Sequence, residues 1–429
     1  MKFTAVGDIL CQRRMAKDYD GFSEVKEFIE RGDARFFNLE TTLNYEGECY
    51  GNQFSGGTYI RCNPEVAEDM LEFGFNITTF NNNHAMDFAH EGLLLTLDYV
   101  NQLGIPHAGV GRNLHEAASP AYLDTKNGKV ALIAINTSFN PALMAGEQSK
   151  RIKGRPGING VTISQKVVLP KEDFEIIRRI GEATGINEQK NVTRAEGYYP
   201  YPPKDVCELG ELQFVLGESH GVRCDVCKED LDRVLRSIRE ARMCADYVMI
   251  SLHSHQLKGG DKTAVPEFLK TLAHTLIDGG ADAIIGHGPH LLRPIEVYKG
   301  KPIFYSLGDF VIQLYDVTIA PEDFYKKYGL DSTYSAIELL EKRSAGFTRG
   351  LMEDRRMLET VIPYWECDEI NNLTYLSLMP VKASKGEGKH LEGLPRPAEN
   401  LDFMYELAKM SEPYGVRITL EGGEWICRW

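Results

Sequence analysis

The chain has 429 residues, of which 43% are hydrophobic, so it is long enough to bury a large core in one domain with insertions or in two domains. Its 62 acidic and 48 basic residues give a formal net charge of −14, which excludes nonspecific binding to nucleic acids and requires local positive charge for any anionic substrate. No segment approaches the roughly 18 apolar residues needed to cross a bilayer.

The first residues enter a strand pattern directly, without the apolar region or small-residue cleavage site of a signal peptide. The chain has 9 cysteines, an odd number spread widely along it, which is typical of a reducing compartment. These features predict a cytoplasmic protein with no membrane span.

Strand and helix patterns alternate along the first part of the chain. Short apolar runs predict strands, and apolar residues at helical spacing predict helices. Pro64 opens one helix and Gly74 ends it. In chain order we expect a strand at 3–6, a helix at 22–29, a strand at 36–39, a helix at 64–73, a strand at 76–80, a helix at 93–103 and a strand at 129–135.

The alternation resumes later and indicates an α/β fold. The expected elements are a helix at 231–243, a strand at 247–252, a helix at 268–277, a strand at 283–285, a strand at 375–381 and a helix at 399–410.

Two regions interrupt this order and define the expected domains. Residues 138–228 are rich in Gly, Pro, Asn and Tyr and would form an insertion long enough for a lid or substrate-binding flap. Residues 316–363 are heavily charged and helical in pattern, and predict a second insertion. The main domain would then span 1–315, and residues 364–429 would form a C-terminal segment that returns to its core.

Acidic residues follow the first predicted strands. Asp8 and Glu40 each come just after an apolar run, and Gly7 lets the backbone turn before Asp8. Ligands bind at the carboxyl ends of strands in α/β folds, so these carboxylates could bind divalent ions, with Glu40 bridging two of them. Either carboxylate alone is more often a helix cap or a solvated loop acid.

The block at 81–87 combines amide, imidazole and carboxylate groups. The amide oxygen of Asn83 is a neutral metal ligand, and His84 is placed to act as a general acid. Asp87, three residues later on a first helical turn, could hold the His84 ring in one tautomer. The alternative is an asparagine-rich turn that caps a helix.

Histidines follow two of the later predicted strands. His287 and His290 belong to a Gly-His-Gly-Pro-His block whose irregular backbone can aim both imidazoles inward. His253 and His255 face the same way if extended conformation continues past the strand. We expect His253 to be a metal ligand, whereas the role of His255 stays open.

Other patterns are weaker. Cys224-x-x-Cys227, with Cys207 and His220 upstream, is similar to half of a zinc knuckle, but the partner spacing fits no defined pattern. No Ser-His-Asp order, Walker loop or Gly-x-Gly-x-x-Gly run competes with a metal site.

Taken together, these motifs resemble the CapA family, the poly-γ-glutamate capsule biosynthesis proteins of the calcineurin-like metallophosphoesterase superfamily. The resemblance covers about residues 1–136 and 229–315, and more weakly 376–420. It rests on Val6-Gly7-Asp8, Asn38-Leu39-Glu40, Asn82-Asn83-His84-x-x-Asp87, Gly286-His287-x-Pro289-His290 and the run Lys-Pro-Ile-Phe-Tyr-Ser-Leu-Gly-Asp-Phe at 301–310. The resemblance implies a four-layer α-β-β-α sandwich with the metals at the strand ends.

The resemblance also implies a role for each residue that matches the family motif. The implied first-site ligands are Asp8 and His290, the bridging ligand is Glu40, the second-site ligands are Asn83, His253 and His287, and the catalytic acid is His84.

Three positions depart from the family pattern. Leu10 stands where the superfamily usually has a histidine, so one first-site ligand is missing and His255 is a candidate substitute. Ser254 and Gln256 flank His255 where the family commonly has a Trp-Gly and a nearby acid. Asp309 stands where the family commonly has an asparagine.

These residues predict a metal-dependent hydrolase related to poly-γ-glutamate capsule biosynthesis or processing. Two divalent ions, Mn²⁺, Fe or Zn²⁺, would activate water while His84 protonates the leaving group of a small or polymeric anionic substrate. Arg13 and Arg14 could bind its phosphate or carboxylate, although a solvated surface explains them equally well. Two alternatives stay open: a non-catalytic polyglutamate-binding or scaffold protein on a degenerate metal site, which Leu10 favours, and a γ-glutamyl amide hydrolase.

Overall fold

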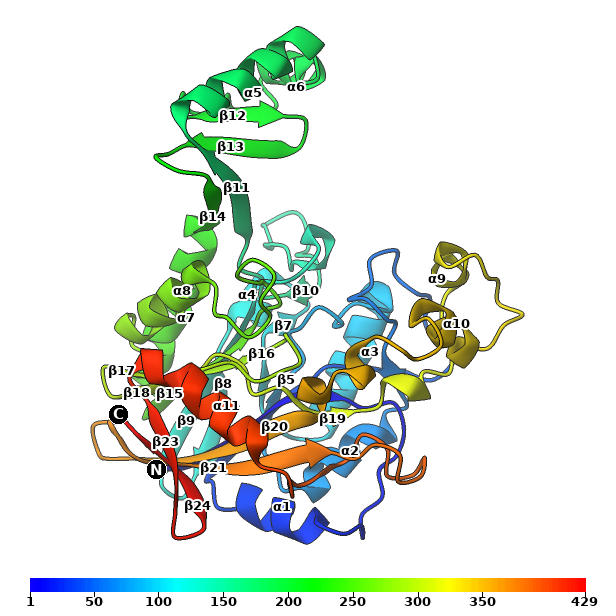
Figure 1. Cartoon of the computed structure of the whole chain (residues 1–429), viewed down its shortest axis with the longest axis vertical. Coiled ribbons are helices and arrows are strands. Elements are labelled where there is room, and N and C mark those ends of the chain that lie inside the picture. Colours follow the sequence, from blue (N-terminus) through cyan, green and yellow to red (C-terminus); the bar gives the residue numbers. More distant parts are fainter. The chain divides into compact units, whose positions relative to one another are not determined.

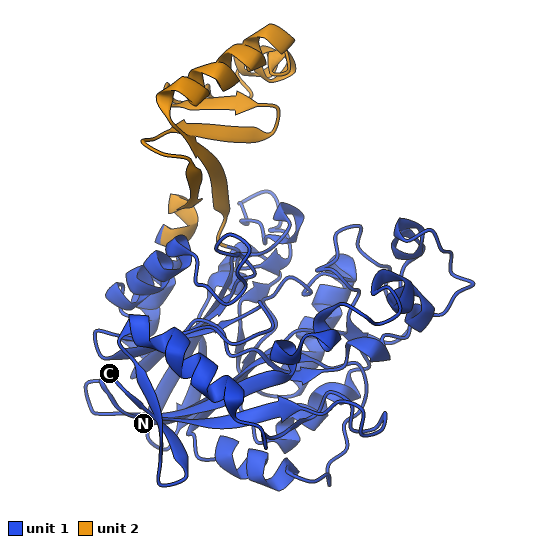
Figure 2. Cartoon of the chain, viewed as in Figure 1, with its two compact units in different colours: residues 1–160, 232–429 blue, residues 161–231 orange.

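The computed structural model describes residues 1–429 and has a mixed α/β fold with several sheets. The chain divides into two compact units, coloured separately in Figure 2. Unit 1 consists of Met1–Gly160 and Asp232–Trp429, and unit 2 is Val161–Leu231. None of the helices is both long enough and apolar enough to cross a membrane.

The larger sheet of unit 1 has 10 strands and contains the first strand of the chain near its centre. β1 pairs in parallel with β2 and β19 and antiparallel with β20, so parallel and antiparallel regions meet at β1. In spatial order the strands are β23 (Arg417–Glu421), β24 (Glu424–Arg428), β21 (Leu373–Ala383), β20 (Glu359–Cys367), β1 (Lys2–Leu10), β2 (Ala34–Leu39), β5 (Ile77–Thr79) and β6 (His107–Ala108), with β19 (Asp309–Ile312) beside β1 and β22 (Pro395–Pro397) beside β21.

A second sheet of unit 1 has 6 strands and a parallel centre. Its order is β17 (Ile295–Tyr298), β18 (Lys301–Phe304), β16 (Ala283–His287), β15 (Tyr247–His253), β9 (Gly128–Asn136) and β8 (Ala121–Thr125). Two short pairs accompany these sheets, β3 (Thr42–Leu43) with β4 (Arg61–Cys62) and β7 (Val110–Gly111) with β10 (Gly157–Ile158).

A shared hydrophobic core joins the two large sheets. Phe3 of β1 stacks on Tyr247 of β15, with ring centroids 4.1 Å apart, and on Trp365 of β20 at 5.2 Å. All three side chains are buried. This core holds β1 against β15, so the ends of these two strands lie near one another.

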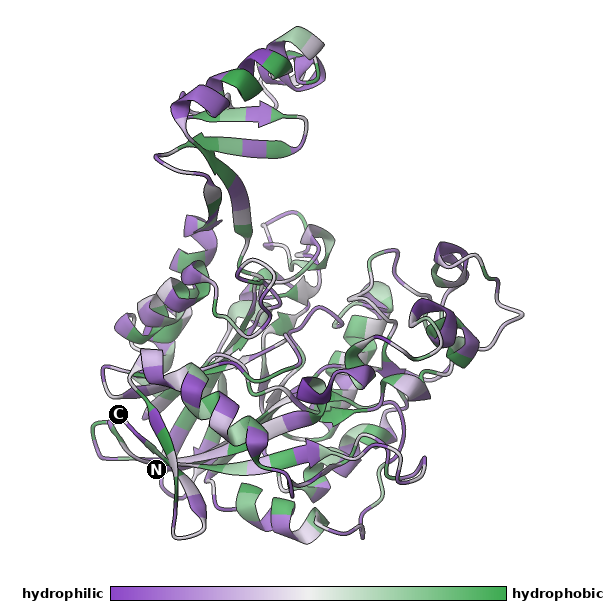
Figure 3. Cartoon of the chain, viewed as in Figure 1, coloured by the Kyte–Doolittle hydropathy of each residue, from purple (hydrophilic) through white to green (hydrophobic).

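Helices cover the other face of the larger sheet. Val25 of α1, Met70 of α2 and Leu93 of α3 pack in one cluster with Ile9 and Leu39 of the sheet. Outside residues 161–227 the chain forms these helices, labelled in Figure 1 where there is room: α1 (Phe22–Ile29), α2 (Glu65–Glu72), α3 (Ala89–Gln102), α4 (Leu114–Ala118), α7 (Lys228–Cys244), α8 (Glu267–Asp278), α9 (Glu322–Lys327), α10 (Ala336–Arg343) and α11 (Asp402–Ser411). Hydrophilic and hydrophobic residues alternate along α7 in Figure 3, as expected of a helix with one buried face.

Unit 2 is smaller than the insertion expected at 138–228. Residues 138–160 belong to unit 1, because β10 pairs with β7 there and Ile158 is buried in the core with the first helices. Unit 2 has its own core of Leu169, Phe174, Cys207 and Phe214. Its elements are β11 (Ile163–Leu169), α5 (Lys171–Thr184), α6 (Glu188–Ala195), β12 (Val206–Leu209), β13 (Leu212–Leu216) and β14 (Gly221–Val226), with sheet order β12-β13-β11-β14.

The charged segment expected to be helical at 316–363 contains only short helices. α9, α10 and 3-10 turns are followed by β20, which begins at Glu359 and lies between β1 and β21. The first seven residues of β20 are buried, as expected for a central strand that is covered on both faces. The C-terminal strands β21, β22, β23 and β24 join the same sheet.

Candidate metal centre

Asp8 lies inside β1, where strand pairing becomes irregular, rather than after the end of the strand as expected. The register of β1 shifts before Asp8 against β2 and after it against β19. Gly7 is required beside it, because a Cβ atom there would overlap the carbonyl oxygen of Gly308. Such an irregularity re-aims a side chain within a sheet.

Two donors fix the Asp8 carboxylate, which is completely buried. The Asn38 side-chain amide donates to Oδ1 at 2.7 Å, and the Gly288 backbone N–H donates to Oδ2 at 2.8 Å. Burial alone would raise the pKa of Asp8, but the hydrogen bond and charge of His287 lower it below its ordinary value. The carboxylate is therefore ionised and held in place.

Glu40 follows β2 and faces the same cluster. Its backbone N–H donates to the carbonyl of Ile9 at 3.0 Å, whereas neither of its carboxylate oxygens has a hydrogen-bond partner although the residue is buried. Burial raises the pKa of Glu40 well above its ordinary value, and the charge of Asp8 adds to the effect. An unpartnered buried carboxyl is costly unless a cation binds it.

His253 and His287 end neighbouring parallel strands, β15 and β16, and lie directly opposite each other in register. Their Nδ1 atoms are 2.8 Å apart, and His287 Nδ1 is 3.2 Å from Asp8 Oδ1. The hydroxyl of Ser251 lies 2.7 Å from the other nitrogen of His287. Burial lowers the pKa of His253 well below its ordinary value, so this imidazole is neutral, the form that binds metals.

Asn83 and His255 complete this side of the cluster. The Asn83 amide donates to the carbonyl of Gly56 at 3.0 Å, which directs its Oδ1 toward His253 Nε2, 2.7 Å away, and His255 Nε2, 3.1 Å away. Burial also lowers the pKa of His255 well below its ordinary value, with His290 contributing. His255 therefore lies beside Glu40 and His253 and faces the cluster. This is the side expected for a residue two positions after His253 in an extended chain.

His290 and Asp309 form the opposite side. His290 Nδ1 is 2.9 Å from Asp309 Oδ1 and 3.8 Å from Asp8 Oδ2, and His290 adopts a positive φ of 62°. Asp309 is directly opposite Asp8 in the parallel β1–β19 ladder, and its Oδ2 is buried without a partner. Burial raises the pKa of Asp309 to about 7.

The His84–Asp87 pair lies beside the cluster, next to Asn83 in the chain. His84 Nδ1 is 2.7 Å from Asp87 Oδ2. Asp87 also accepts backbone hydrogen bonds from Gly56 at 2.7 Å and Ile60 at 2.9 Å, and it is completely buried. This saturated carboxylate fixes the ring so that Nε2 is the nitrogen left for a substrate.

The donor set fits divalent metal ions. Three overlapping groups of carboxylate and imidazole donors lie close enough for each to bind an ion. Buried oxygens of Glu40 and Asp309 lack hydrogen-bond partners, and a bound cation would satisfy them. The groups are Asp8–His253–His287, Glu40–His253–His255 and Asp8–His290–Asp309.

The structure does not bring every candidate residue to this cluster. Arg13 pairs with Asp316 at 2.8 Å, and Arg14 pairs with Asp69 at 2.6 Å. Both guanidinium groups are therefore already engaged by carboxylates away from the cluster.

The cysteine and histidine residues compared with a zinc knuckle do not converge. His220 binds Asp173 at 2.7 Å, Cys227 contacts Glu229 at 3.3 Å and Cys207 is in the core of unit 2. All cysteines are free thiols.

Sequence reasoning missed Asp309 as a member of the cluster. Asp309 begins a strand instead of following one, so the pattern that indicates the other carboxylates does not apply to it. The available signal was its Leu-Gly-Asp-Phe context, which repeats the apolar-Gly-Asp order around Asp8.

Comparison with protein families gives a match to nearly three quarters of the chain. The profile described as bacterial capsule synthesis protein PGA_cap matches residues 2–314. This range contains the whole cluster together with His84 and Asp87.

Individual relatives extend the similarity. A protein of Sinorhizobium fredii described as uncharacterized protein y4sH is 32% identical over 435 residues, covering 97% of this chain and 90% of the relative. The PGA biosynthesis protein CapA of Bacillus subtilis is 25% identical over 312 residues, covering 71% of this chain and 62% of the relative. The capsule biosynthesis protein CapA of Bacillus anthracis is 23% identical over 318 residues, covering 72% and 59%.

Proposed function

The chain belongs to the PGA_cap family of bacterial capsule synthesis proteins, and from this premise we propose that it is a metal-dependent hydrolase acting at the cluster around Asp8. One observation carries the proposal: acidic and imidazole side chains converge in a buried site while oxygens of Glu40 and Asp309 lack partners. A purely structural cluster would satisfy these atoms internally.

Two neighbouring ions fit the donor arrangement. Asp8, His290 and Asp309 would hold one, and Glu40, Asn83, His253 and His255 would hold the other, with His287 beside Asp8 between them. Mixed imidazole and carboxylate donors suit Mn²⁺, Fe or Zn²⁺. When bound, such ions supply Lewis acidity that activates water and stabilises developing negative charge.

The remaining chemistry belongs to His84. The Asp87 carboxylate accepts a hydrogen bond from Nδ1–H of the protonated His84 ring, which leaves Nε2–H as the group that can donate its proton to a departing oxygen or nitrogen. Because Gly56 and Ile60 hold the Asp87 carboxylate, the His84 ring keeps its orientation through the reaction.

The proposed substrate is an anionic polymer related to γ-linked polyglutamate. The Bacillus relatives are named for PGA and capsule biosynthesis, which supports this class. The hydrolysed bond is a phosphoester of an anionic substrate, as in metallophosphoesterases, or, in the polymer itself, the γ-glutamyl amide.

We also propose that unit 1 is a four-layer α-β-β-α sandwich. The shared core between the two sheets and the packing of α1, α2 and α3 on the outer face of the larger sheet support three of the layers. α8, which buries Leu269, Leu272 and Leu276 along one face, would belong to the fourth.

A non-catalytic polyglutamate-binding protein is the second candidate. Leu10 favours it, because this residue is completely buried in β1 where a histidine ligand is usual. Asp309 makes the non-catalytic candidate weaker, because it adds a carboxylate to the side of the cluster that lacks the histidine.

Metal analysis and activity assays separate the candidates. The hydrolase is expected to contain stoichiometric divalent metal and to show Mn²⁺-stimulated hydrolysis of an aryl phosphate or release of glutamate from a γ-linked oligomer. Metal-free protein that stays inactive toward both substrates after addition of Mn²⁺, Fe²⁺ or Zn²⁺ would favour the binding protein.

A further inference from the structure

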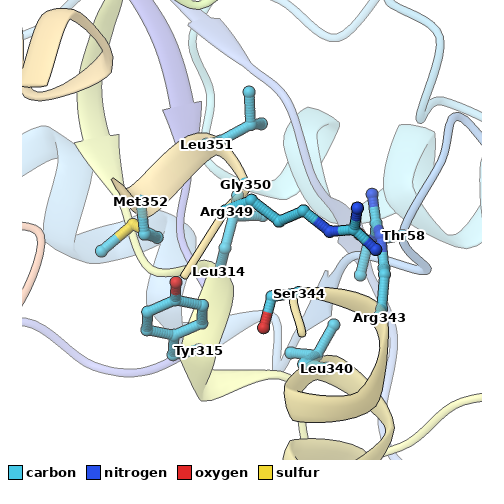
Figure 4. Close-up of a pocket in the computed structure, with 10 residues that line it drawn as sticks. All are labelled: Thr58, Leu314, Tyr315, Leu340, Arg343, Ser344, Arg349, Gly350, Leu351 and Met352. Atoms are coloured by element: carbon cyan, nitrogen blue, oxygen red, sulfur yellow. The ribbon is translucent and has the colours of Figure 1, made fainter. Parts of the chain in front are cut away.

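Unit 1 contains a cavity whose lining includes none of the cluster residues. It has a volume of about 300 Å³, within the size range of small-ligand sites. Apolar side chains of Leu314, Leu340 and Met352 form part of its wall, together with the hydroxyl groups of Thr58 and Ser344 (Figure 4).

Two arginines, Arg343 and Arg349, line this cavity without an acidic partner. Arg343 donates to the Thr58 hydroxyl and lies over the Phe324 ring, 5.9 Å from its centroid. In Figure 4 the Arg349 side chain extends toward Thr58 and Arg343. No carboxylate oxygen lies within 4.0 Å of either guanidinium, although the chain carries a net charge of −14. The cavity therefore concentrates unneutralised positive charge.

The backbone that presents Arg349 is strained. Ala345 and Phe347 have positive φ angles of 54° and 53°, a conformation that residues with a Cβ rarely adopt. Such strain persists where surrounding structure enforces it, and it is frequent at ligand sites.

The cavity is next to the His84–Asp87 pair through one loop. Thr58 is two residues from Gly56, whose N–H donates to Asp87 and whose carbonyl accepts from Asn83. Two residues of extended chain span about 7 Å at most. The cavity therefore shares this loop with the residues that hold the His84–Asp87 pair.

We infer that this cavity binds the α-carboxylate of one residue of a γ-linked glutamate chain. The inference rests on the proposed function and specifies how its substrate is recognised. Arg343 and Arg349 offer the planar N–H groups that bind carboxylates in pairs, and the leucine and methionine side chains can pack against the methylene groups of the polymer backbone.

Calorimetric binding of γ-linked tetraglutamate to the full chain in EDTA tests this site without turnover. Arg349 is exposed, so Arg349→Gln should fold normally, and it should bind the oligomer at least about tenfold more weakly than the wild type. Arg349→Lys should fall between them because it keeps the charge but loses the paired N–H groups. Arg112→Gln, which removes an exposed arginine paired with Asp98, is the matched control and should bind like the wild type.

Several outcomes would overturn the inference. These are no binding by the wild type, equal binding by Arg349→Gln, equal binding of the oligomer with its carboxylates amidated, and displacement of the oligomer by equimolar inorganic phosphate. Because the measurement uses metal-free protein, its failure leaves metal content and His84-dependent turnover, the tests of the proposed function, untouched.

Discussion

Asp309 shows most clearly how the chain's own residues would govern the proposed metal binding. Its pKa is raised from 3.8 to about 7, because burial disfavours the charged carboxyl. A metal binds the ionised form, so protons compete increasingly with the metal as pH falls below about 7. In metal-free protein the same raised pKa lowers this group's contribution to stability as pH rises from about 4 to about 7.

We therefore predict that the apparent Mn²⁺ affinity falls between pH 8 and pH 6, by up to about tenfold per pH unit. Titration calorimetry at several pH values measures it. Asp309→Asn should weaken binding and flatten this dependence, whereas Asp124→Asn, at an exposed position, should change neither. A wild-type affinity that is independent of pH in this range would contradict the assignment.

His84 is predicted to act on the substrate rather than on the metal. His84→Asn should lower kcat for Mn²⁺-dependent hydrolysis by about 10² to 10⁴, the usual contribution of a general acid, while metal content stays unchanged. The exposed His115→Asn variant is the control. Loss of metal together with activity would place His84 among the ligands instead.

At the scale of elements, the close approach of β1 to the segment before β19 shapes the site. A Cβ at residue 7 would overlap the carbonyl oxygen of Gly308, and backbone cannot move aside as a flexible side chain can. Gly7→Ala should therefore lower the free energy of unfolding by about 1 to 3 kcal/mol and weaken metal binding through displacement of Asp8.

Denaturant unfolding and metal titration measure both effects of Gly7→Ala. Gly260→Ala is the matched control, because a Cβ there meets no atom within 4 Å. Wild-type stability and metal affinity in Gly7→Ala would show that the β1 irregularity does not position Asp8.

The elements themselves were largely predictable, and their exact ends were not. Apolar spacing indicated α1, β9, β15 and α8 because each buries one face or both faces in the core. The candidate site residues at or just after strand ends, such as Glu40 and His287, are indicated by the same patterns. Asp309 was missed because its place opposite Asp8 arises from pairing between strands about 300 residues apart, which spacing along the chain does not encode.

For the whole molecule, unit 2 is predicted to be dispensable for metal binding. All cluster residues belong to unit 1, and unit 2 has a separate core. The N–H of Cys227 donates to the carbonyl of Thr162 at 2.9 Å, so a short Gly-Ser linker can replace residues 163–226.

We expect this shortened chain to bind as much metal as the full chain and to unfold cooperatively in thermal unfolding. Loss of metal binding by a folded shortened chain would mean that unit 2 supports the cluster.

The cavity lined by Arg343 and Arg349 could not be predicted from the sequence. Its lining comes from segments near residues 58, 315, 342 and 350, which only the folded chain brings together. The charged pattern of that region predicted a helical insertion and gave no sign that two of its arginines line a cavity.

Whether the cluster around Asp8 binds metal ions can be measured by anomalous scattering from crystals of the full chain grown with Mn²⁺. We expect anomalous peaks within the cluster, bound by Asp8, His290 and Asp309 on one side and by Glu40, Asn83 and His253 on the other. Crystals with no anomalous peak among these residues at millimolar Mn²⁺, or with ions bound only elsewhere on the chain, would contradict this expectation.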